Sequence, residues 1–275
     1  MFEIIVPVLT LSGLGLIFGI GLAIAAKKLC VATDPRIDEV FSNLPGTNCG
    51  ACGMAGCMGF AEGLIQGTCT IEKCPVTELQ KKIEIAGLLG QEVKQKVKTI
   101  AVLHCGGGKR AKHKFKYDGV KDCIAANLIL GGHKACVYGC LGFATCVRAC
   151  PFGAITMGGD ELPIVNEEKC TACGKCVAIC PKKLFSLAPI GKKFYTNCAS
   201  LDFGKAVLEV CPLGCIACGK CEKVCPVSAI KVVDNLAIFD YEKCQNIGEC
   251  LKVCPTKCIV KRSNEDITYG TRSAT

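Results

Sequence analysis

The stretch CTACGKCVAICP at residues 170–181 decides the fold of this chain, and CIACGKCEKVCP at residues 215–226 repeats its pattern. Three cysteines spaced in this way wrap one face of a cubane, whereas the cysteine before proline ligates the other cluster of a pair. Cysteines so close in sequence are poorly placed to form a disulfide with one another. The two stretches therefore predict [4Fe-4S] clusters held in pairs, because a zinc site has no use for this crossed arrangement.

Composition favours thiolate ligation in a reducing compartment. The chain has 26 cysteines among 275 residues, with three His and no Trp, and its length allows two or three small domains. The formal charge of +9 assumes neutral thiols. Clusters of about −2 each, six in number, would bring it to about −3. We therefore expect no nucleic-acid partner.

The cysteines also reveal an internal repeat. One group recurs 75 positions later, and a second group recurs 74 positions later. The first comprises Cys123, Cys136, Cys140, Cys146 and Cys150, which recur as Cys198, Cys211, Cys215, Cys221 and Cys225; the second comprises Cys170, Cys176 and Cys180, which recur as Cys244, Cys250 and Cys254. Cys105 likewise lies 75 positions before Cys180. The region 105–258 therefore resembles two copies of one two-cluster ferredoxin unit.

The segments between the motifs agree with an α+β ferredoxin-like fold. Residues 154–165 and 229–239 each contain two short apolar runs around a turn of Gly/Asp or Asp-Asn residues. Such runs predict β-hairpins. Each hairpin is expected to lie between two cluster loops.

Two motifs depart from the pattern, because Phe143 and Ile247 stand where a cysteine is expected. A site lacking one thiolate either holds a [3Fe-4S] cluster or recruits a cysteine from elsewhere. Cys136 and Cys258 are the candidate replacements. Recruitment is supported by the count, since the 20 cysteines from Cys105 to Cys258 form five sets of four.

The crossing rule divides part of this group. It predicts two sets, Cys170, Cys173 and Cys176 with Cys150, and Cys215, Cys218 and Cys221 with Cys254. A third set is expected to join Cys225, Cys244 and Cys250 with the candidate replacement Cys258. Spacing leaves the division of the other eight open, namely Cys105, Cys123, Cys136, Cys140, Cys146, Cys180, Cys198 and Cys211.

A separate group precedes the repeat. Cys49, Cys52 and Cys57 are followed by Cys74-Pro75, and this pattern predicts one more [4Fe-4S] cluster, with a four-cysteine zinc site as the alternative. The expected total is then about six clusters. Cys30 and Cys69 are expected to be spare thiols.

The N-terminal residues 4–26 form a run of 23 positions without a charge. A helix of this length spans the hydrocarbon core of a bilayer, about 30 Å thick. A secretory signal peptide is the alternative, but its positive charge precedes the apolar run, whereas here Lys27 and Lys28 follow it. The positive-inside rule then places the remaining chain in the cytoplasm. We expect a single uncleaved anchor.

These observations give a domain order for the chain. The expected parts are a transmembrane anchor (1–29), a membrane-proximal 4Fe-4S domain (30–80), a linker helix and strand (81–104), a first ferredoxin-like repeat (105–195), a second (196–260) and a tail (261–275). The stretch CGGGKR at residues 105–110 only weakly resembles a phosphate-binding loop, because it lacks the spacing of a Walker motif. No dinucleotide fingerprint or acid/base pair is present in the sequence, so we expect electron transfer without a substrate-converting site.

The layout of motifs resembles one known family. The stretches DPRIDEV (34–40), LPGTNCGACGMAGC (44–57) and CVYGCLGFATCVRACPFGAI (136–155) are similar to the B subunit of the Rnf complex, the ion-pumping ferredoxin:NAD oxidoreductase of bacterial membranes. The resemblance implies an inner-membrane protein that takes electrons from soluble reduced ferredoxin on the cytoplasmic side. It further implies the A, C, D, E and G subunits of that complex as partners, NAD reduction coupled to outward movement of Na+ or H+, and a membrane-proximal cluster on Cys49, Cys52, Cys57 and Cys74.

Two other interpretations remain open at this level. One is an iron-sulfur subunit of another membrane oxidoreductase, such as a hydrogenase or formate dehydrogenase, and the more remote one is a zinc-stabilised binding module. On the electron-transfer interpretation, Lys182, Lys183, Lys192 and Lys193 are candidates for steering an acidic ferredoxin onto the surface.

Overall fold

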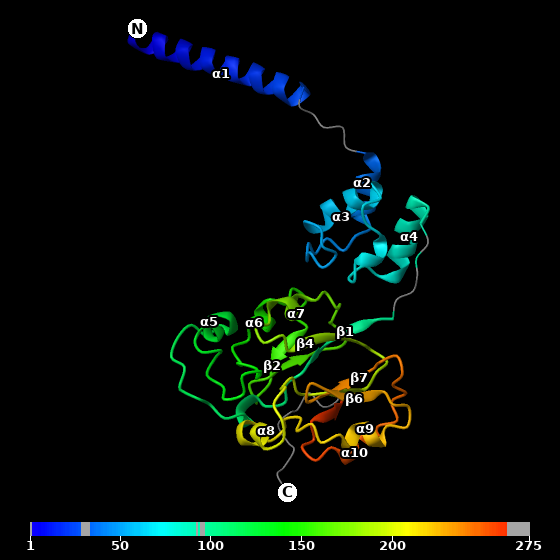
Figure 1. Ribbon diagram of the computed structural model, residues 1–275. Helices are drawn as coiled ribbons and strands as arrows, with labels where there is room; N and C mark the ends of the chain where they lie inside the picture. The colour runs from blue at the N-terminus through cyan, green and yellow to red at the C-terminus, as the bar shows by residue number, and fades with distance from the viewer. Residues whose placement is uncertain (1, 29–33, 92, 94–96, 263–275) are drawn as a thin grey trace.

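The computed structural model describes residues 2–28, 34–91, 93 and 97–262. Figure 1 shows three parts in chain order: a long N-terminal helix, a small helical domain and a larger body of short helices and strands. Cys30 and residues 263–275 of the expected tail lie outside the described residues.

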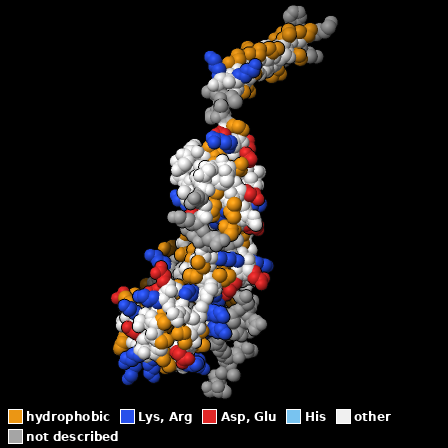
Figure 2. Space-filling model, turned by 90° about the vertical axis from the view of Figure 1, so that its right-hand side faces the viewer, with side chains coloured by type: hydrophobic (Ala, Val, Ile, Leu, Met, Phe, Trp, Pro, Cys, Tyr) orange, Lys and Arg blue, Asp and Glu red, His pale blue; other side chains and the backbone are white. Residues whose placement is uncertain are grey.

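The N-terminal helix α1 runs from Phe2 to Lys28, and Lys27 and Lys28 form its basic last turn. Figure 2 shows hydrophobic side chains along it and lysine side chains at the end that leads to the rest of the chain. By length and composition, Val8–Lys28 is able to cross a membrane. The predicted apolar helix is thus present.

The small domain contains α2 (Pro35–Ser42), α3 (Gly56–Ile65), the 3-10 turn η1 (Ile71–Lys73) and α4 (Leu79–Leu89). Asp34 caps α2 by accepting the N–H of Arg36 at 3.0 Å. Gly90, with φ +65°, ends α4 in the left-handed conformation that favours glycine. The core of this domain consists of Val40, Phe60, Leu64, Ile71 and Ile85, which are all at most 1% exposed.

The larger body contains four two-stranded antiparallel sheets. They pair β1 (Thr99–Leu103) with β4 (Phe185–Pro189), β2 (Ile155–Met157) with β3 (Pro163–Val165), β5 (Phe194–Thr196) with β8 (Ile259–Lys261), and β6 (Ile230–Val233) with β7 (Leu236–Phe239). Both predicted hairpins are confirmed as the β2–β3 and β6–β7 pairs. Strand β1, which we expected in the linker, instead belongs to the sheet of the module that follows.

Short helices separate these strands. They are η2 (Gly108–Arg110), α5 (Cys123–Leu128), α6 (Thr145–Arg148), α7 (Lys175–Ile179), α8 (Lys205–Val210), α9 (Lys220–Val224) and α10 (Glu249–Val253). The order helix, hairpin, helix, strand occurs twice, as α6–β2–β3–α7–β4 and as α9–β6–β7–α10–β8. Helices α7, α9 and α10 end at the cysteine that precedes proline, because the residue before a proline is driven out of the helical conformation.

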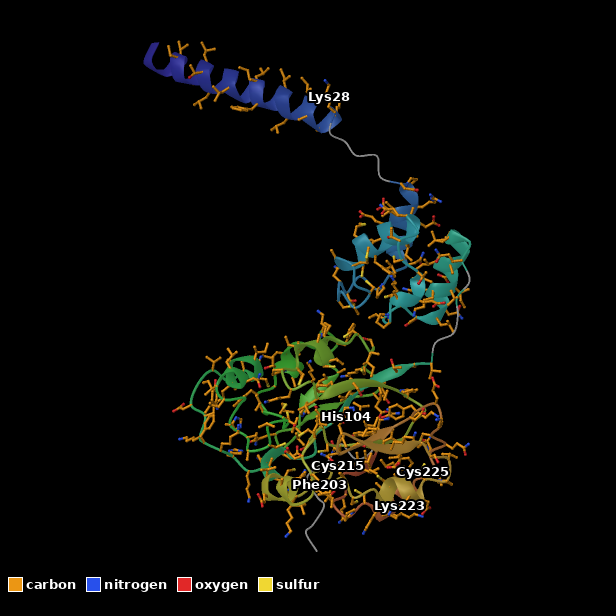
Figure 3. All side chains as sticks on the ribbon, in the orientation of Figure 1. Lys28, His104, Phe203, Cys215, Lys223 and Cys225 are labelled. Atoms are coloured by element: carbon orange, nitrogen blue, oxygen red, sulfur yellow. The ribbon has the colours of Figure 1, made fainter. Side chains whose placement is uncertain are left out.

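The two modules of the body pack against each other through apolar and polar contacts. Val102 and Ala188 of the first module form one buried cluster with Tyr195 and Val260 of the second. His104, which Figure 3 labels, contacts the Ser186 hydroxyl through Nε2 and the Thr196 carbonyl oxygen through Nδ1, both at 2.7 Å. These contacts fix the strands that lead into the cysteine-bearing loops.

Candidate iron-sulfur sites

The four cysteine motifs of the larger body share one backbone conformation. In each loop, the second and fourth residues after the first cysteine have positive φ; these pairs are Gly142 and Ala144, Ala172 and Gly174, Ala217 and Gly219, and Asn246 and Gly248. Left-handed residues at these positions curl the chain and turn successive N–H groups toward the inside of the loop. The loops that carry Phe143 and Ile247 adopt this conformation too, so each replacement occupies the place of the missing cysteine.

The turn after each motif is equally regular. The backbone N–H four residues beyond the last cysteine donates to its sulfur: Ala154 to Cys150 at 3.4 Å, Leu184 to Cys180 at 3.5 Å, Ala229 to Cys225 at 3.2 Å, and Cys258 to Cys254 at 3.2 Å. Hydrogen bonds to sulfur favour the thiolate form that a metal cluster requires. All four turns are therefore suited to thiolate ligands.

Two predicted sets of cysteines surround hollows in the structure. One hollow of about 330 Å³, open mouth included, is lined by Cys150, Cys170, Cys173 and Cys176. Another of about 350 Å³ is lined by Cys215, Cys218, Cys221 and Cys254, and also by Cys258. In each set one cysteine, Cys150 or Cys254, comes from the other motif of its module. This is the arrangement that the crossing rule predicts.

A third hollow, of about 320 Å³, is lined by Cys225, Cys244, Cys250 and Ile247. Figure 3 labels Cys215 and Cys225, which begin and end one motif and line different hollows. Cys258, which we expected in this set, does not line this hollow but the hollow of Cys215. The third hollow is therefore lined by three thiols and an isoleucine.

Cys258 instead lies beside Cys198 and Cys215. The neighbouring Cys258 thiol lowers the pKa of Cys198 to about 7 and the pKa of Cys215 to about 6. The reason is local, because the turn that presents the Cys258 N–H to Cys254 directs its side chain into the core, where it is 2% exposed.

Beside the Phe143 motif the structure places Cys123, whereas the expected Cys136 lines another hollow. Burial and the neighbouring thiols of Cys123 and Cys180 together raise the pKa of Cys146 to about 12. Burial also raises the pKa of Cys140, and the thiols of Cys105 and Cys123 add to this effect. These interactions place Cys123, Cys140, Cys146 and Cys180 near one another. The Phe143 ring meanwhile packs against the rings of Tyr117 and His133, with centroids 5.3 and 5.1 Å away.

The four remaining cysteines of the body, Cys105, Cys136, Cys198 and Cys211, line a hollow of about 380 Å³. The structure thus divides the eight positions that spacing left open into two groups of four. Sequence spacing gives no signal for this second group, because its members lie outside the CxxCxxCxxxCP motifs.

In the small domain, Cys57 and Cys74 are buried, and Cys52 packs against the same core. Asn48 accepts the N–H of Cys57 at 2.7 Å, and Thr77 donates its hydroxyl to the Cys74 sulfur at 3.1 Å. Cys49 precedes Gly50, which has φ +72°. These contacts order the loop that carries the predicted ligands of this domain.

Cys69 differs from these predicted ligands. Burial raises the pKa of its thiol, which lies 3.7 Å from the Phe60 carbonyl oxygen. This setting suits the spare thiol that we expected.

The thiols fit a polynuclear cluster better than a disulfide or a single zinc ion. All 25 described cysteines are free. Within the described residues, no three or more His, Cys, Asp or Glu side chains are arranged to hold one metal ion. The sulfurs around a zinc ion would be about 3.8 Å apart. Thiols placed around hollows and hydrogen-bonded by N–H groups match the larger cubane.

Comparison with known proteins finds iron-sulfur families in the same parts of the chain. Residues 44–76 match the model of a putative Fe-S cluster family, and residues 134–185 and 206–258 each match a 4Fe-4S dicluster domain. The B subunit of the Na(+)-translocating ferredoxin:NAD(+) oxidoreductase complex of Acetobacterium woodii is 44% identical over 272 residues, which cover 98% of this chain and 80% of that protein.

Two further relatives are similar over most of their length. The B subunit of the ion-translocating oxidoreductase complex of Methanosarcina acetivorans is 43% identical, and the match covers 92% of this chain and 96% of that protein. The B subunit of the proton-translocating ferredoxin:NAD(+) oxidoreductase complex of Clostridium ljungdahlii is 42% identical, and the match covers 89% and 87%.

Proposed function

We propose that the chain is an electron relay, because it belongs to the family of B subunits of ion-translocating ferredoxin:NAD(+) oxidoreductase complexes. It takes electrons from reduced ferredoxin and relays them through about six [4Fe-4S] clusters. It is an electron-transfer iron-sulfur subunit of an oxidoreductase. One observation carries the finer proposal: the two crossed sets of thiols surround hollows inside the stretches that match dicluster domains. Family membership disfavours a role in a hydrogenase or formate dehydrogenase, and it also disfavours a zinc-stabilised binding module.

The protein's part in this function is to hold and insulate. Bound cubanes supply sites that accept and release one electron. The thiols of the cysteine groups described above would hold the clusters. The backbone N–H groups that donate hydrogen bonds to these sulfurs would stabilise the negative charge of the thiolates. The hollow lined by Cys225, Cys244 and Cys250 offers three thiols, so it is the candidate site for a [3Fe-4S] cluster, and the Phe143 site is not.

We also propose that the two modules derive from one duplicated two-cluster unit. The offset of 75 residues between their cysteines supports this origin. Further support comes from the repeated order of elements and from the same left-handed positions in all four loops.

The membrane topology is part of the same proposal. A helix of the length and composition of Val8–Lys28 suits one crossing of the inner membrane. Lys27 and Lys28 at its end favour a cytoplasmic location for the cluster domains. The other proteins of the complex, which by the resemblance are its A, C, D, E and G subunits, would receive the electrons there.

Two of the four lysines proposed for the docking of ferredoxin have side chains that are free to meet it. Lys182 donates to the Val137 carbonyl oxygen at 2.7 Å, and Lys192 donates to the Cys244 carbonyl oxygen at 2.5 Å. Lys183 and Lys193 are exposed. Their charges are therefore better placed to attract an acidic partner.

The direct test combines composition with electron uptake. Anaerobically purified chain should contain about 24 irons and as much acid-labile sulfide, if six cubanes are present. Mixed with reduced ferredoxin, it should oxidise the ferredoxin and develop the paramagnetic signals of reduced clusters. Colourless protein that contains zinc and no sulfide would contradict the proposal, and so would iron-loaded protein that leaves reduced ferredoxin unchanged.

A further inference from the structure

One hollow of the larger body is built by both modules. Cys105 follows β1, and Cys136 precedes the first cysteine motif, so both belong to the first module. Cys198 follows β5, and Cys211 ends α8, so both belong to the second. The family matches to dicluster domains begin at residues 134 and 206, and Cys105 and Cys198 lie before them.

One of these sulfurs in each module accepts a backbone hydrogen bond. Cys105 accepts the N–H of Cys140 at 3.4 Å, and Cys198 accepts the N–H of Ser200 at 3.3 Å. Free thiols that are hydrogen-bonded in this way are typical of thiolate ligands rather than of core cysteines.

Gly107 allows the backbone to pass between two of these sulfurs. A Cβ atom at this position would lie 3.3 Å from the Cys211 sulfur and 3.9 Å from the Cys105 sulfur. At Gly106, a Cβ atom would lie 2.8 Å from the Asn197 side-chain nitrogen. The CGGG stretch therefore serves close approach around the hollow, and this explains the glycines that resembled a phosphate loop.

Backbone hydrogen bonds fix the ligand segments of the two modules to each other. The N–H of Gly106 donates to the Asn197 carbonyl oxygen at 2.9 Å, next to Cys105 and Cys198. The N–H of Lys112 donates to the Val210 carbonyl oxygen at 2.9 Å, next to Cys211. The four thiols are thus held by a rigid junction rather than by free loops.

From these observations we propose that Cys105, Cys136, Cys198 and Cys211 hold a [4Fe-4S] cluster at the junction of the two modules. This inference rests on the proposed electron relay and assigns it a central step. The site would take the same cofactor as its neighbours, and it connects them.

Neighbouring cysteine groups adjoin the junction hollow on both sides. On the first-module side, the N–H that binds the Cys105 sulfur belongs to Cys140, a member of the Cys123 group. On the second-module side, Cys258 lies beside Cys198 and lines the hollow of Cys215. Each transfer across the junction moves one electron, oxidises one cluster and reduces the next, and makes or breaks no bond. The junction cluster thereby turns two separate pairs into one relay.

The test uses ligands from opposite modules in the full-length chain. Cys105→Ser and Cys211→Ser should each lower the iron content by about four atoms relative to wild type, with matching loss of sulfide. The double variant should lose the same four and no more, because both thiols hold one cluster. A loss of about eight in the double variant, or full iron in either single variant, would overturn the proposal.

The matched control is Cys258→Ser, which changes a buried thiol that lines the neighbouring hollow of Cys215 and not the junction hollow. It should keep the paramagnetic signal of the junction cluster, whereas loss of the same signal that Cys105→Ser removes would show that Cys258 is a ligand of this cluster and that the set is wrong. Electron paramagnetic resonance of the reduced variants should still display the other clusters, which shows that the modules are folded. If a serine variant loses all iron, Gly107→Ala tests the site instead, because this variant keeps every thiol. Selective loss of one cluster from Gly107→Ala supports the proposed site, whereas unchanged iron and spectra contradict it.

Failure of this inference differs from failure of the proposed function. Wild-type protein with full iron that leaves reduced ferredoxin unchanged would contradict the function only. Wild-type protein that oxidises ferredoxin, with unchanged iron in Cys105→Ser and Cys211→Ser, would contradict the junction cluster only.

Discussion

Thr145 accepts a hydrogen bond from the backbone N–H of Cys123 at 2.8 Å, and this bond joins the first residue of α5 to α6, the helix that carries Cys146. The same hydroxyl donates to Asp122 Oδ2 at 2.8 Å, and Arg148 donates to that oxygen at 2.9 Å. Asp122 also caps α5 by accepting the N–H of Ile124 at 2.8 Å. One carboxylate therefore holds Cys123 beside the motif that carries Phe143.

Asp122→Ala should loosen this cluster site. The variant loses the N-cap of α5, which lowers the stability of the protein by about 1 kcal/mol. It also removes the carboxylate that Thr145 and Arg148 both bind. We expect the cluster held by the Cys123 group to be lost faster on mild chelation, as measured by the decay of its paramagnetic signal. The matched control is Asp34→Ala, which removes another helix-capping aspartate beside an arginine, Arg36. Equal decay in both variants would contradict the positioning role.

The same network has a defined pH dependence. The hydrogen bond from Thr145 is the main cause that lowers the pKa of Asp122. A lowered folded-state pKa stabilises the protein above the unfolded value of about 3.9, and this stabilisation is lost as the pH falls through the folded value. The difference in stability between wild type and Asp122→Ala should thus be constant from about pH 6 to 8 and shrink below about pH 4. A difference that shrinks between pH 6 and 8 would point to another group.

Ile247→Cys should supply the thiolate that the third hollow lacks. Ile247 occupies the place of a motif cysteine and is 49% exposed, so the sulfur replaces it without repacking a core. We expect a stable fourth iron at this site and the loss of any three-iron signal seen in oxidised wild type. Phe143→Cys is the control and should gain no iron if Cys123, whose thiol neighbours Cys146, is the fourth ligand of its site. Equal gains in both variants would contradict this assignment.

The sequence predicts a cysteine group well when its members are placed by nearby residues of the chain, and poorly when contacts between distant parts of the chain place them. The crossed sets and both hairpins follow from local spacing, and the structure brings together Cys150 with Cys170 and Cys215 with Cys254. Cys136, the expected replacement for Phe143, lies with Cys105 in the junction hollow. Its placement depends on contacts between modules, which spacing along the chain does not encode. Cys258, which we expected with Cys225, lines the hollow of Cys215 instead. The turn after Cys254 places it there, and the spacing of the cysteines does not reveal that turn.

Gly108→Ala should be far more destabilising than Gly90→Ala. Both residues have positive φ, +50° and +65°, so each alanine costs about 1–2 kcal/mol in backbone strain. A Cβ atom at Gly108 would also lie 2.2 Å from the Asp160 carbonyl oxygen, whereas at Gly90 no described atom lies within 4 Å. That carbonyl oxygen accepts the N–H of Lys109 at 2.9 Å, so the backbone cannot easily move away. Thermal bleaching of cluster absorbance should occur at a clearly lower temperature in Gly108→Ala only.

Reversal of charge at Lys183 and Lys193 should slow electron uptake from an acidic ferredoxin. Both side chains are exposed, and electrostatic attraction between the partners raises association rates by about 10-fold or more at low ionic strength. We expect the double variant Lys183→Glu, Lys193→Glu to accept electrons roughly 10-fold more slowly in dilute buffer, measured by stopped-flow mixing with reduced ferredoxin. Added salt should remove the difference, because the Debye length falls to about 3 Å at 1 M.

The control for this experiment changes the charge on the small domain. Lys81 is exposed on α4, and Lys81→Glu alters net charge without altering the surface beside the cluster motifs. If the rate falls equally in this variant, steering depends on total charge rather than on a docking surface. A wild-type rate that does not change with ionic strength would exclude steering by any of these lysines, because a rate limited by attraction between opposite charges must fall as salt screens them.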